Sequence, residues 1–268
     1  MHDSPTAIAF PSAGEARLMP CKPPESGPGE LGIRTEYSGV SQGTEIWAYL
    51  GNRPELTFPT VPGYQTVGII ESMGEGVSGF KVGQRVLFHR SRLGEAWPET
   101  WMGGHVSHAV TPVSNEPAPT IIPDGVDPIA ASLVALAAVS LRGIEMLKID
   151  YGDLVLVTGQ GLIGQAAAQL ARNRGATVVA TDIHSKRLDL SDAYSADVVV
   201  NPLEENLGGI VRRLKPNGAD ALIETTGRSE AFAECVELLR WEGQFLMHGY
   251  YPKPITFDFH ATHMKKRT

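Results

Sequence analysis

The spacing of apolar positions changes once along this chain of 268 residues. Up to about residue 115, short apolar or β-branched runs are separated by glycine, proline and charged residues, as in a small barrel or sandwich. From Tyr151 onward, strand-like runs alternate with helical stretches, which is typical of a parallel, doubly wound α/β sheet. We therefore expect a β-rich domain at residues 1–118 and an α/β domain at residues 119–268.

Helix boundaries are indicated at two places. Asp127 followed by Pro128 predicts a helix start, with the acid as N-cap and the proline in the first turn. A later helix is expected to begin at Ser229 and to stop at Gly243. The expected strands are 31–37, 66–72, 85–89 and 105–110 in the first domain, and 154–158, 177–181, 197–200, 219–224 and 244–248 in the second.

The second domain is one strand short of a complete fold of this type. Such a sheet usually has six strands, and only five can be placed before Thr268. We expect the sheet to lack its last strand and the chain to be a fragment of a longer protein.

A glycine-rich turn follows the 154–158 run and reads Gly159-Gln160-Gly161-Leu162-Ile163-Gly164. In the sequence strand, G-x-G-x-x-G, helix, the first glycine permits a tight turn, the second lets a pyrophosphate approach the backbone, and the third lets the helix pack closely. The helix start adds unpaired N–H groups and a partial positive charge. This order predicts a dinucleotide site.

Asp182 ends the next strand-like run, about twenty residues beyond the turn, where an acid meets the adenosine ribose hydroxyls. A carboxylate there accepts hydrogen bonds from both hydroxyls and repels a 2′-phosphate, so it favours NAD over NADP. The alternative is that Asp182 only caps the following helix or is solvated in a loop.

Composition narrows the class of protein. With 42% hydrophobic and 20% charged residues the chain is globular, and a net charge of −7 disfavours nucleic acid and anionic membranes as partners. No apolar stretch reaches the ~20 residues of a membrane span, and no signal peptide opens the chain. Two distant cysteines, Cys21 and Cys235, make no disulfide framework or metal cluster. We expect a soluble cytoplasmic protein.

Four stretches together carry a resemblance to a known family. In chain order they are 38–45 (SGVSQGTE), 62–68 (PGYQTVG), 79–86 (GFKVGQRV) and 151–153 (YGD). In this combination the chain resembles the medium-chain dehydrogenase/reductase family. The resemblance implies a GroES-like β-barrel that binds the substrate, a Rossmann-type coenzyme domain, and hydride transfer between a small-molecule substrate and a nicotinamide coenzyme.

The departures from that family concern zinc. Its zinc enzymes place cysteine, histidine, glutamate and cysteine where this chain has Ser41, Tyr64, Gln65 and Leu136, and these four side chains do not supply a zinc set. We expect no zinc, and the chain looks most like the zinc-less branch that includes the bacteriochlorophyllide dehydrogenases, which oxidise a secondary alcohol. Metal capture by three other histidines is an alternative to a structural or solvated role for them: His89, His105 and His108.

The resemblance places four candidate catalytic residues around the reacting centre. Tyr64 is the first, either as an acid/base or orienting phenol or as a side chain that fills the volume of a metal. Ser41 and Thr44 lie in the same motifs. Glu45 could relay a proton to solvent, or it could be a solvated residue of a helix start.

The resemblance also implies coenzyme contacts at the ends of later strands and beside the ribose. Trp97 and Trp101 could rim the substrate cleft or simply pack their loop. The expected coenzyme residues beyond the glycine turn and Asp182 are Arg187, Thr225, Thr226, Gly227, His248 and Gly249.

The sequence thus favours an NAD-dependent, zinc-independent oxidoreductase acting on a secondary alcohol or ketone, with a homodimer expected. Two alternatives stay open. One is an NADPH-dependent enoyl or quinone reductase on the same scaffold. The other is a non-catalytic dinucleotide-binding protein.

Overall fold

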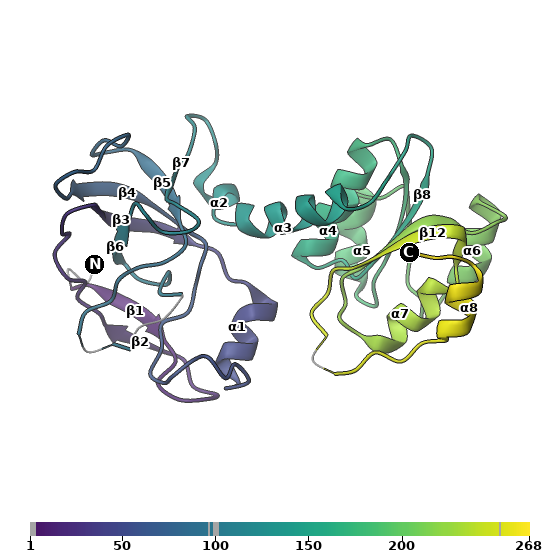
Figure 1. Ribbon diagram of the computed structural model, residues 1–268, viewed down its shortest axis with the longest axis horizontal. Coiled ribbons are helices and arrows are strands. Elements are labelled where there is room, and N and C mark those ends of the chain that lie inside the picture. The colour runs from purple at the N-terminus through teal and green to yellow at the C-terminus, as the bar shows by residue number, and fades with distance from the viewer. Residues whose placement is uncertain (1–3, 96, 99–101, 252) are drawn as a thin grey trace. The chain divides into compact units, whose positions relative to one another are not determined.

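A five-stranded antiparallel sheet forms the centre of the N-terminal part of the protein (Figure 1). The structure is a computed structural model, which describes residues 4–95, 97–98, 102–251 and 253–268 of the chain. The strand order of this sheet is β6-β3-β4-β5-β7, and β1 and β2 pair separately. Buried side chains of these strands form the core of this unit, among them Leu31, Ile33 and Phe88. The bounds are β1 Thr6–Ala9, β2 Arg17–Pro20, β3 Glu30–Ser38, β4 Thr66–Met73, β5 Arg85–Phe88, β6 His108–Pro112 and β7 Thr120–Ile121, with helix α1 at Gln42–Tyr49.

The chain divides into two compact units, residues up to Ala135 and residues from Leu136 onward. Strand β7 (Thr120–Ile121) pairs with β5, so residues just beyond the boundary expected at residue 118 continue the sheet of the first unit. Asp127 accepts a hydrogen bond from the Ile129 N–H (2.8 Å), which confirms the predicted helix start. The helices that follow are α2 Pro128–Ala131 and α3 Val134–Glu145.

A parallel sheet of order β10-β9-β8-β11-β12 forms the second unit. Strand β8 is buried on both faces: Val155 and Val157 pack with alanines of α4, while Leu154 and Leu156 pack in the core that contains residues of α6 and α7. This is the doubly wound arrangement that the alternating pattern predicted. The elements are β8 Leu154–Thr158, α4 Leu162–Asn173, β9 Thr177–Thr181, α5 Ser185–Tyr194, β10 Val198–Val200, α6 Leu207–Leu214, β11 Ala219–Glu224, α7 Ser229–Val236, β12 Leu239–Met247 and α8 Phe259–Met264.

The predicted end of the helix after Ser229 is wrong. Helix α7 stops at Val236, and Gly243 lies inside β12. Between the pairs Leu239↔Ala219 and Gln244↔Ala221 the register shifts, so β12 carries a bulge that includes Gly243. Arg228, not Ser229, is the N-cap of α7.

Strand β12 is the edge of this sheet. The last residue lies beside it: the Thr268 N–H donates to the Gly243 carbonyl (3.1 Å), and the Phe245 N–H donates to the Thr268 carbonyl (2.6 Å). Part of the β12 edge is therefore covered by the chain itself.

Each unit holds one cysteine in its core. Cys21 packs in the first unit and Cys235 in the second, and both are free thiols. Burial raises the pKa of the Cys21 thiol and raises that of Cys235 to about 12. Both side chains therefore stay protonated at neutral pH.

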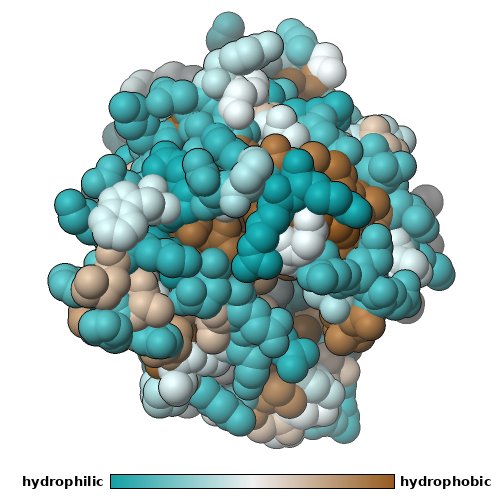
Figure 2. Space-filling model, turned by 90° about the vertical axis from the view of Figure 1, so that its right-hand side faces the viewer, coloured by the Kyte–Doolittle hydropathy of each residue, from teal (hydrophilic) through white to brown (hydrophobic). Residues whose placement is uncertain are grey.

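Large apolar side chains are also exposed on the second unit, among them Trp241, Phe259 and Met264. Figure 2 shows one side of the molecule, on which hydrophilic residues divide the apolar ones into several groups. Among the residues that the structure describes, no helix has the length and apolar character needed to cross a bilayer.

Candidate active site

Two glycines of the turn between β8 and α4 are required by the fold itself. Gly159 has φ +82°, and a Cβ there would lie 2.9 Å from the Thr225 Oγ1. A Cβ on Gly164 would lie 1.8 Å from the Gly159 carbonyl oxygen. Any side chain at either position would displace neighbouring backbone or the threonines that follow β11.

Gly161 differs from these two glycines. It is the N-cap of α4 with an ordinary φ of −74°, and a Cβ there would have no atom within 4 Å among the residues that the structure describes. The N–H groups of Leu162 and Ile163, in the first turn of α4, lack intrahelical acceptors by the geometry of any α-helix. The open space over Gly161 therefore lies at the helix end that favours an anion.

Asp182 is buried beside this turn. Its carboxylate accepts hydrogen bonds from the Gln160 N–H (2.7 Å) and the His184 N–H (2.9 Å), and it pairs with Arg187 (3.3 Å). The residue is therefore not solvated, and it joins the glycine turn to the start of α5. Its predicted contact with a ribose stays a prediction.

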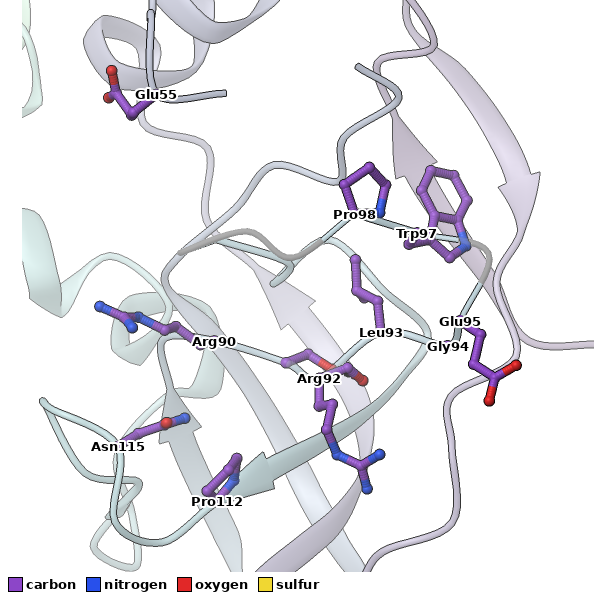
Figure 3. A pocket seen from close by; sticks show the side chains of 11 residues that line it. Glu55, Arg90, Arg92, Leu93, Gly94, Glu95, Trp97, Pro98, Pro112 and Asn115 are labelled. Atoms are coloured by element: carbon purple, nitrogen blue, oxygen red, sulfur yellow. Dashed lines mark hydrogen bonds between the residues drawn. The ribbon is translucent and has the colours of Figure 1, made fainter. Parts of the chain in front are cut away.

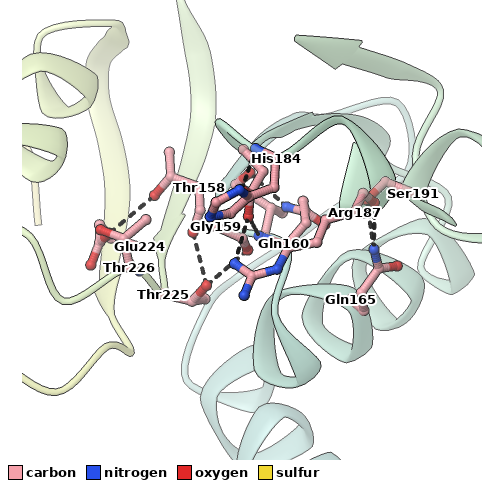
Figure 4. A network of polar contacts seen from close by, with 12 residues as sticks. Thr158, Gly159, Gln160, Gln165, His184, Arg187, Ser191, Glu224, Thr225 and Thr226 are labelled. Atoms are coloured by element: carbon pink, nitrogen blue, oxygen red, sulfur yellow. Dashed lines mark hydrogen bonds and ion pairs between the residues drawn. The ribbon is translucent and has the colours of Figure 1, made fainter. Parts of the chain in front are cut away.

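Two glutamines to which the sequence motif assigned no role, Gln160 and Gln165, also fix the turn (Figure 4). The Gln160 side chain donates to the Val157 carbonyl (3.0 Å) and accepts from the Ser191 hydroxyl (3.0 Å). Gln165 of α4 donates to the same hydroxyl (2.8 Å). Gln160 occupies an unspecified position of the motif and Gln165 follows its last glycine, so no sequence signal marked either residue.

Glu224, at the end of β11, was also missed, and it organises the predicted residues that follow. Its fully buried carboxylate accepts from the N–H groups of Thr226 (2.7 Å) and Gly227 (3.2 Å). Its carbonyl accepts from the N–H groups of His248 and Gly249 (2.8 Å each). The loops after β11 and β12 are thereby brought together. They carry five predicted coenzyme residues, whose contact with a coenzyme stays a prediction: Thr225, Thr226, Gly227, His248 and Gly249.

Two further groups lie at this junction. The Tyr251 hydroxyl donates to the Glu224 carboxylate, and burial together with this bond raises the pKa of the phenol. The His248 ring packs against Gly143, where a Cβ would lie 2.6 Å from its Cε1. Burial lowers the pKa of His248, so its imidazole stays neutral at pH 7.

In the first unit, Ser41 and Glu45 stand at the start of α1. Ser41 is the N-cap, its N–H donates to the Glu45 carboxylate (2.9 Å), and its carbonyl accepts from the Glu45 N–H (2.8 Å). The other oxygen of Glu45 accepts from His105 Nε2 (2.8 Å). Glu45 is therefore buried, which contradicts a solvated position, while Thr44 beside it is half-buried.

Tyr64 and Gln65 form the second motif of this unit. Tyr64 is half-buried, and its carbonyl accepts from His89 Nδ1 (2.7 Å). Burial lowers the pKa of His89. Gln65 is fully buried, and neither polar atom of its amide has a hydrogen-bond partner in the structure. A buried amide of this kind is costly unless a polar group meets it, which makes Gln65 a site residue that the sequence reading had dismissed as a non-ligand.

The donor chemistry at these motifs does not fit a zinc ion. Ser41, Tyr64 and Gln65 offer no thiolate, imidazole or carboxylate, and His105 and Glu45 bind each other instead. In the part of the chain that the structure describes, no three histidine, cysteine, aspartate or glutamate side chains gather as a metal site.

A pocket of about 670 Å³ lies on the first unit (Figure 3). Trp97, Leu93 and Arg90 are among the residues that line it. Trp97 therefore borders a hollow, while Trp101, also predicted at a cleft rim, lies outside the described residues.

Comparison with known proteins gives consistent matches. Residues 27–114 match the alcohol dehydrogenase GroES-like domain, and residues 163–268 match the family described as zinc-binding dehydrogenase. Sorbitol dehydrogenase of Halalkalibacterium halodurans is 31% identical over 264 residues, which cover 88% of this chain and 74% of that protein.

Solved structures share the fold. The 2R,3R-butanediol dehydrogenase of Bacillus subtilis superposes with a TM-score of 0.85 at 21% identity, over 99% of this chain and 83% of that one. A protein of Sinorhizobium meliloti solved bound to NADP superposes with a TM-score of 0.85 at 22% identity, over 99% and 83% of the two chains.

Proposed function

This chain belongs to the medium-chain dehydrogenase/reductase family, and from that membership we propose that it is an NAD-dependent oxidoreductase acting on a secondary alcohol or its ketone without zinc. Its N-terminal unit is the GroES-like domain of that family and its C-terminal unit the Rossmann-type domain. As a member it is an oxidoreductase, and the substrate, the coenzyme preference and the independence from zinc are the parts proposed.

The observation that carries the proposal is the open space over Gly161. Neighbouring atoms explain the absence of a side chain at Gly159 and Gly164, but no contact of the described residues explains it at Gly161. A pyrophosphate resting on the start of α4 does explain it. Gly159, Gly161, Leu162, Ile163 and Gly164 would then hold the coenzyme phosphates.

Asp182 supports NAD over NADP. Its carboxylate is fixed at the end of β9 by the Gln160 and His184 N–H groups. A 2′-phosphate beside this buried negative charge would be repelled, whereas two ribose hydroxyls could donate to it. Arg187 offsets part of the charge at 3.3 Å and would lie beside the adenosine ribose.

The independence from zinc is supported by the donor set. Where a zinc site needs about three thiolate, imidazole or carboxylate ligands, this chain offers a serine, a tyrosine and a glutamine at the positions of the family's ligands. His105 and Glu45, an imidazole and a carboxylate close to these motifs, are already hydrogen-bonded to each other.

Alcohol oxidation then needs a hydride acceptor, which a bound nicotinamide supplies, and side chains that hold the hydroxyl and take its proton. We assign the second task to Tyr64, which takes the proton as a phenolate and becomes the phenol, with Ser41 and Thr44 orienting the oxygen by hydrogen bonds. Glu45 is buried against His105, so it acts on Ser41 through the Ser41 N–H rather than as a route to solvent.

Two measurements test the proposal. Fluorescence titration with NADH and NADPH should show tighter binding of NADH. A panel of aliphatic, sugar and polycyclic secondary alcohols with NAD should show turnover that is unchanged by metal chelators. A clear preference for NADPH, with reduction of enones or quinones, would support the reductase alternative, and binding of NADH without turnover of any substrate would support a binding protein.

A further inference from the structure

The candidate catalytic side chains of the first unit come from two separate segments. One contains Ser41, Thr44 and Glu45 at the start of α1, and the other is the loop before β4 with Tyr64 and Gln65. Backbone pairing joins the segments where β3 meets β4 at Ser38↔Thr66 and where the Gly39 N–H donates to the Gln65 carbonyl (2.8 Å). Side chains add further contacts between them.

His105 lies between these segments. Both nitrogens of its ring form hydrogen bonds to residues at or just before the start of α1. Nδ1 is 2.8 Å from the Ser38 hydroxyl at the end of β3, and Nε2 is 2.8 Å from the Glu45 carboxylate in α1. The side chains of His105 and Glu45 are only 3% and 6% exposed. One imidazole therefore fixes where α1 begins relative to the end of β3.

The same histidine holds the second segment. Its backbone N–H donates to the Pro62 carbonyl (3.0 Å), and the adjoining Gly104 N–H donates to the Gly63 carbonyl (2.9 Å). Gly63 has φ +92°, and a Cβ on it would lie 2.7 Å from the His105 ring. The ring thus packs against Gly63, the residue that precedes Tyr64.

We propose that His105 is a positioning residue, which keeps Ser41 and Thr44 at a fixed distance from Tyr64 and Gln65. The inference rests on the proposed function, because it concerns the geometry of that reaction. His105 acts through Glu45, whose second oxygen holds the Ser41 N–H. Removing the imidazole leaves a buried carboxylate without its donor, so Glu45 must move and Ser41 moves with it.

The experiment compares His105→Phe, His105→Gln and the control His108→Gln, whose histidine is half-buried and hydrogen-bonded to Ser107. Phenylalanine fills the ring volume without either hydrogen bond, and glutamine can keep one of them. The readouts are kcat and KM on an alcohol that the wild type oxidises, the Kd of NADH, the melting temperature, and hydrogen exchange of the Ser41 amide.

For His105→Phe we expect kcat to fall by about 10²-fold, the cost of a misplaced reacting group, with the Kd of NADH unchanged. Exchange of the Ser41 amide should accelerate by about tenfold. His105→Gln should lie between this variant and the wild type, and His108→Gln should match the wild type.

Wild-type kcat in folded His105→Phe would overturn the proposal. So would a loss that only follows the melting temperature, with unchanged kcat per folded molecule and an unchanged Ser41 exchange rate. If His105→Phe does not fold, the same criteria apply to His105→Gln. A wild type that oxidises none of the alcohols would defeat the proposed function instead, and the Ser41 exchange rates would still decide whether His105 fixes α1.

Discussion

The two units build their candidate sites in different ways. In the C-terminal unit, one short stretch supplies a strand, a glycine turn and a helix start, and the steric reasons for Gly159 and Gly164 lie within a few residues and in the adjoining strand end. In the N-terminal unit, the contacts are distant in sequence, since His105 bonds residues 67 and 60 positions away at Ser38 and Glu45. A site made of neighbouring residues is defined by its motif, whereas a site made of distant ones is defined by the fold.

The largest expected effect is a difference in the free energy of unfolding between alanine variants of two glycines in the same turn, Gly164 and Gly161. Gly164→Ala places a methyl group 1.8 Å from the Gly159 carbonyl oxygen and should lower the free energy of unfolding by about 3 kcal/mol. Gly161→Ala points into open space and should change it by less than about 0.5 kcal/mol. Urea unfolding of both variants measures this difference.

The same pair tests the coenzyme site. In Gly161→Ala the affinity for NADH should fall at least about tenfold, or 1.4 kcal/mol, because the new methyl group occupies the space assigned to the phosphates. NADH titration of the folded variant provides the measurement. Undiminished affinity would remove the observation on which the proposed function depends.

Tyr64→Phe probes the other unit. If the Tyr64 side chain accepts the hydroxyl proton of the substrate, kcat of the variant should fall by about 10²-fold. Its NADH affinity and melting temperature should stay near those of the wild type. Tyr37→Phe, at an exposed position of β3, serves as the control. Equal turnover in both variants would assign Tyr64 a space-filling role.

Asp182→Asn keeps the side-chain shape and removes its charge. The preference for NAD over NADP should fall by about tenfold, with a smaller loss of stability because the amide oxygen can still accept from the Gln160 or His184 N–H. The control is Asp189→Asn on the exposed side of α5. An unchanged ratio of the two coenzyme affinities would leave Asp182 with its structural role alone.

The smallest effect concerns pH and one histidine in each unit. Burial lowers the pKa of both His89 and His248, so below about pH 6.5 the unfolded chain binds more protons than the folded one. The free energy of unfolding should therefore decrease as the pH falls below about 6.5. Urea unfolding between pH 7.5 and 5.5 measures the decrease, which should shrink in His89→Asn or His248→Asn and persist in the exposed control His260→Gln.

How far the sequence predicts the fold depends on the range of the contacts. The parallel sheet, its glycine turn and the Asp127 helix cap follow from local patterns, and the structure has all three. The end of α7 could not be predicted from local patterns. Gly243 resembles a helix stop, but it lies in a bulge of β12 that arises only from pairing with β11.

The candidate sites show the same limit. The resemblance pointed to Ser41, Glu45 and Tyr64, but not to the imidazole that lies between their segments. His105 is preceded by glycines and flanked by a valine, a setting with no periodicity that would indicate a partner. Glu224 likewise ends an apolar strand. Nothing in the sequence around it indicates that it accepts hydrogen bonds from the N–H groups of two loops.

The two buried cysteines give the protein a built-in pair of unfolding reporters. Because Cys21 is in the core of one unit and Cys235 in the core of the other, an alkylating reagent can reach each thiol only when its own unit opens. Mass spectrometry of the labelled peptides would then give separate opening rates for the two halves of one chain, without introducing a probe.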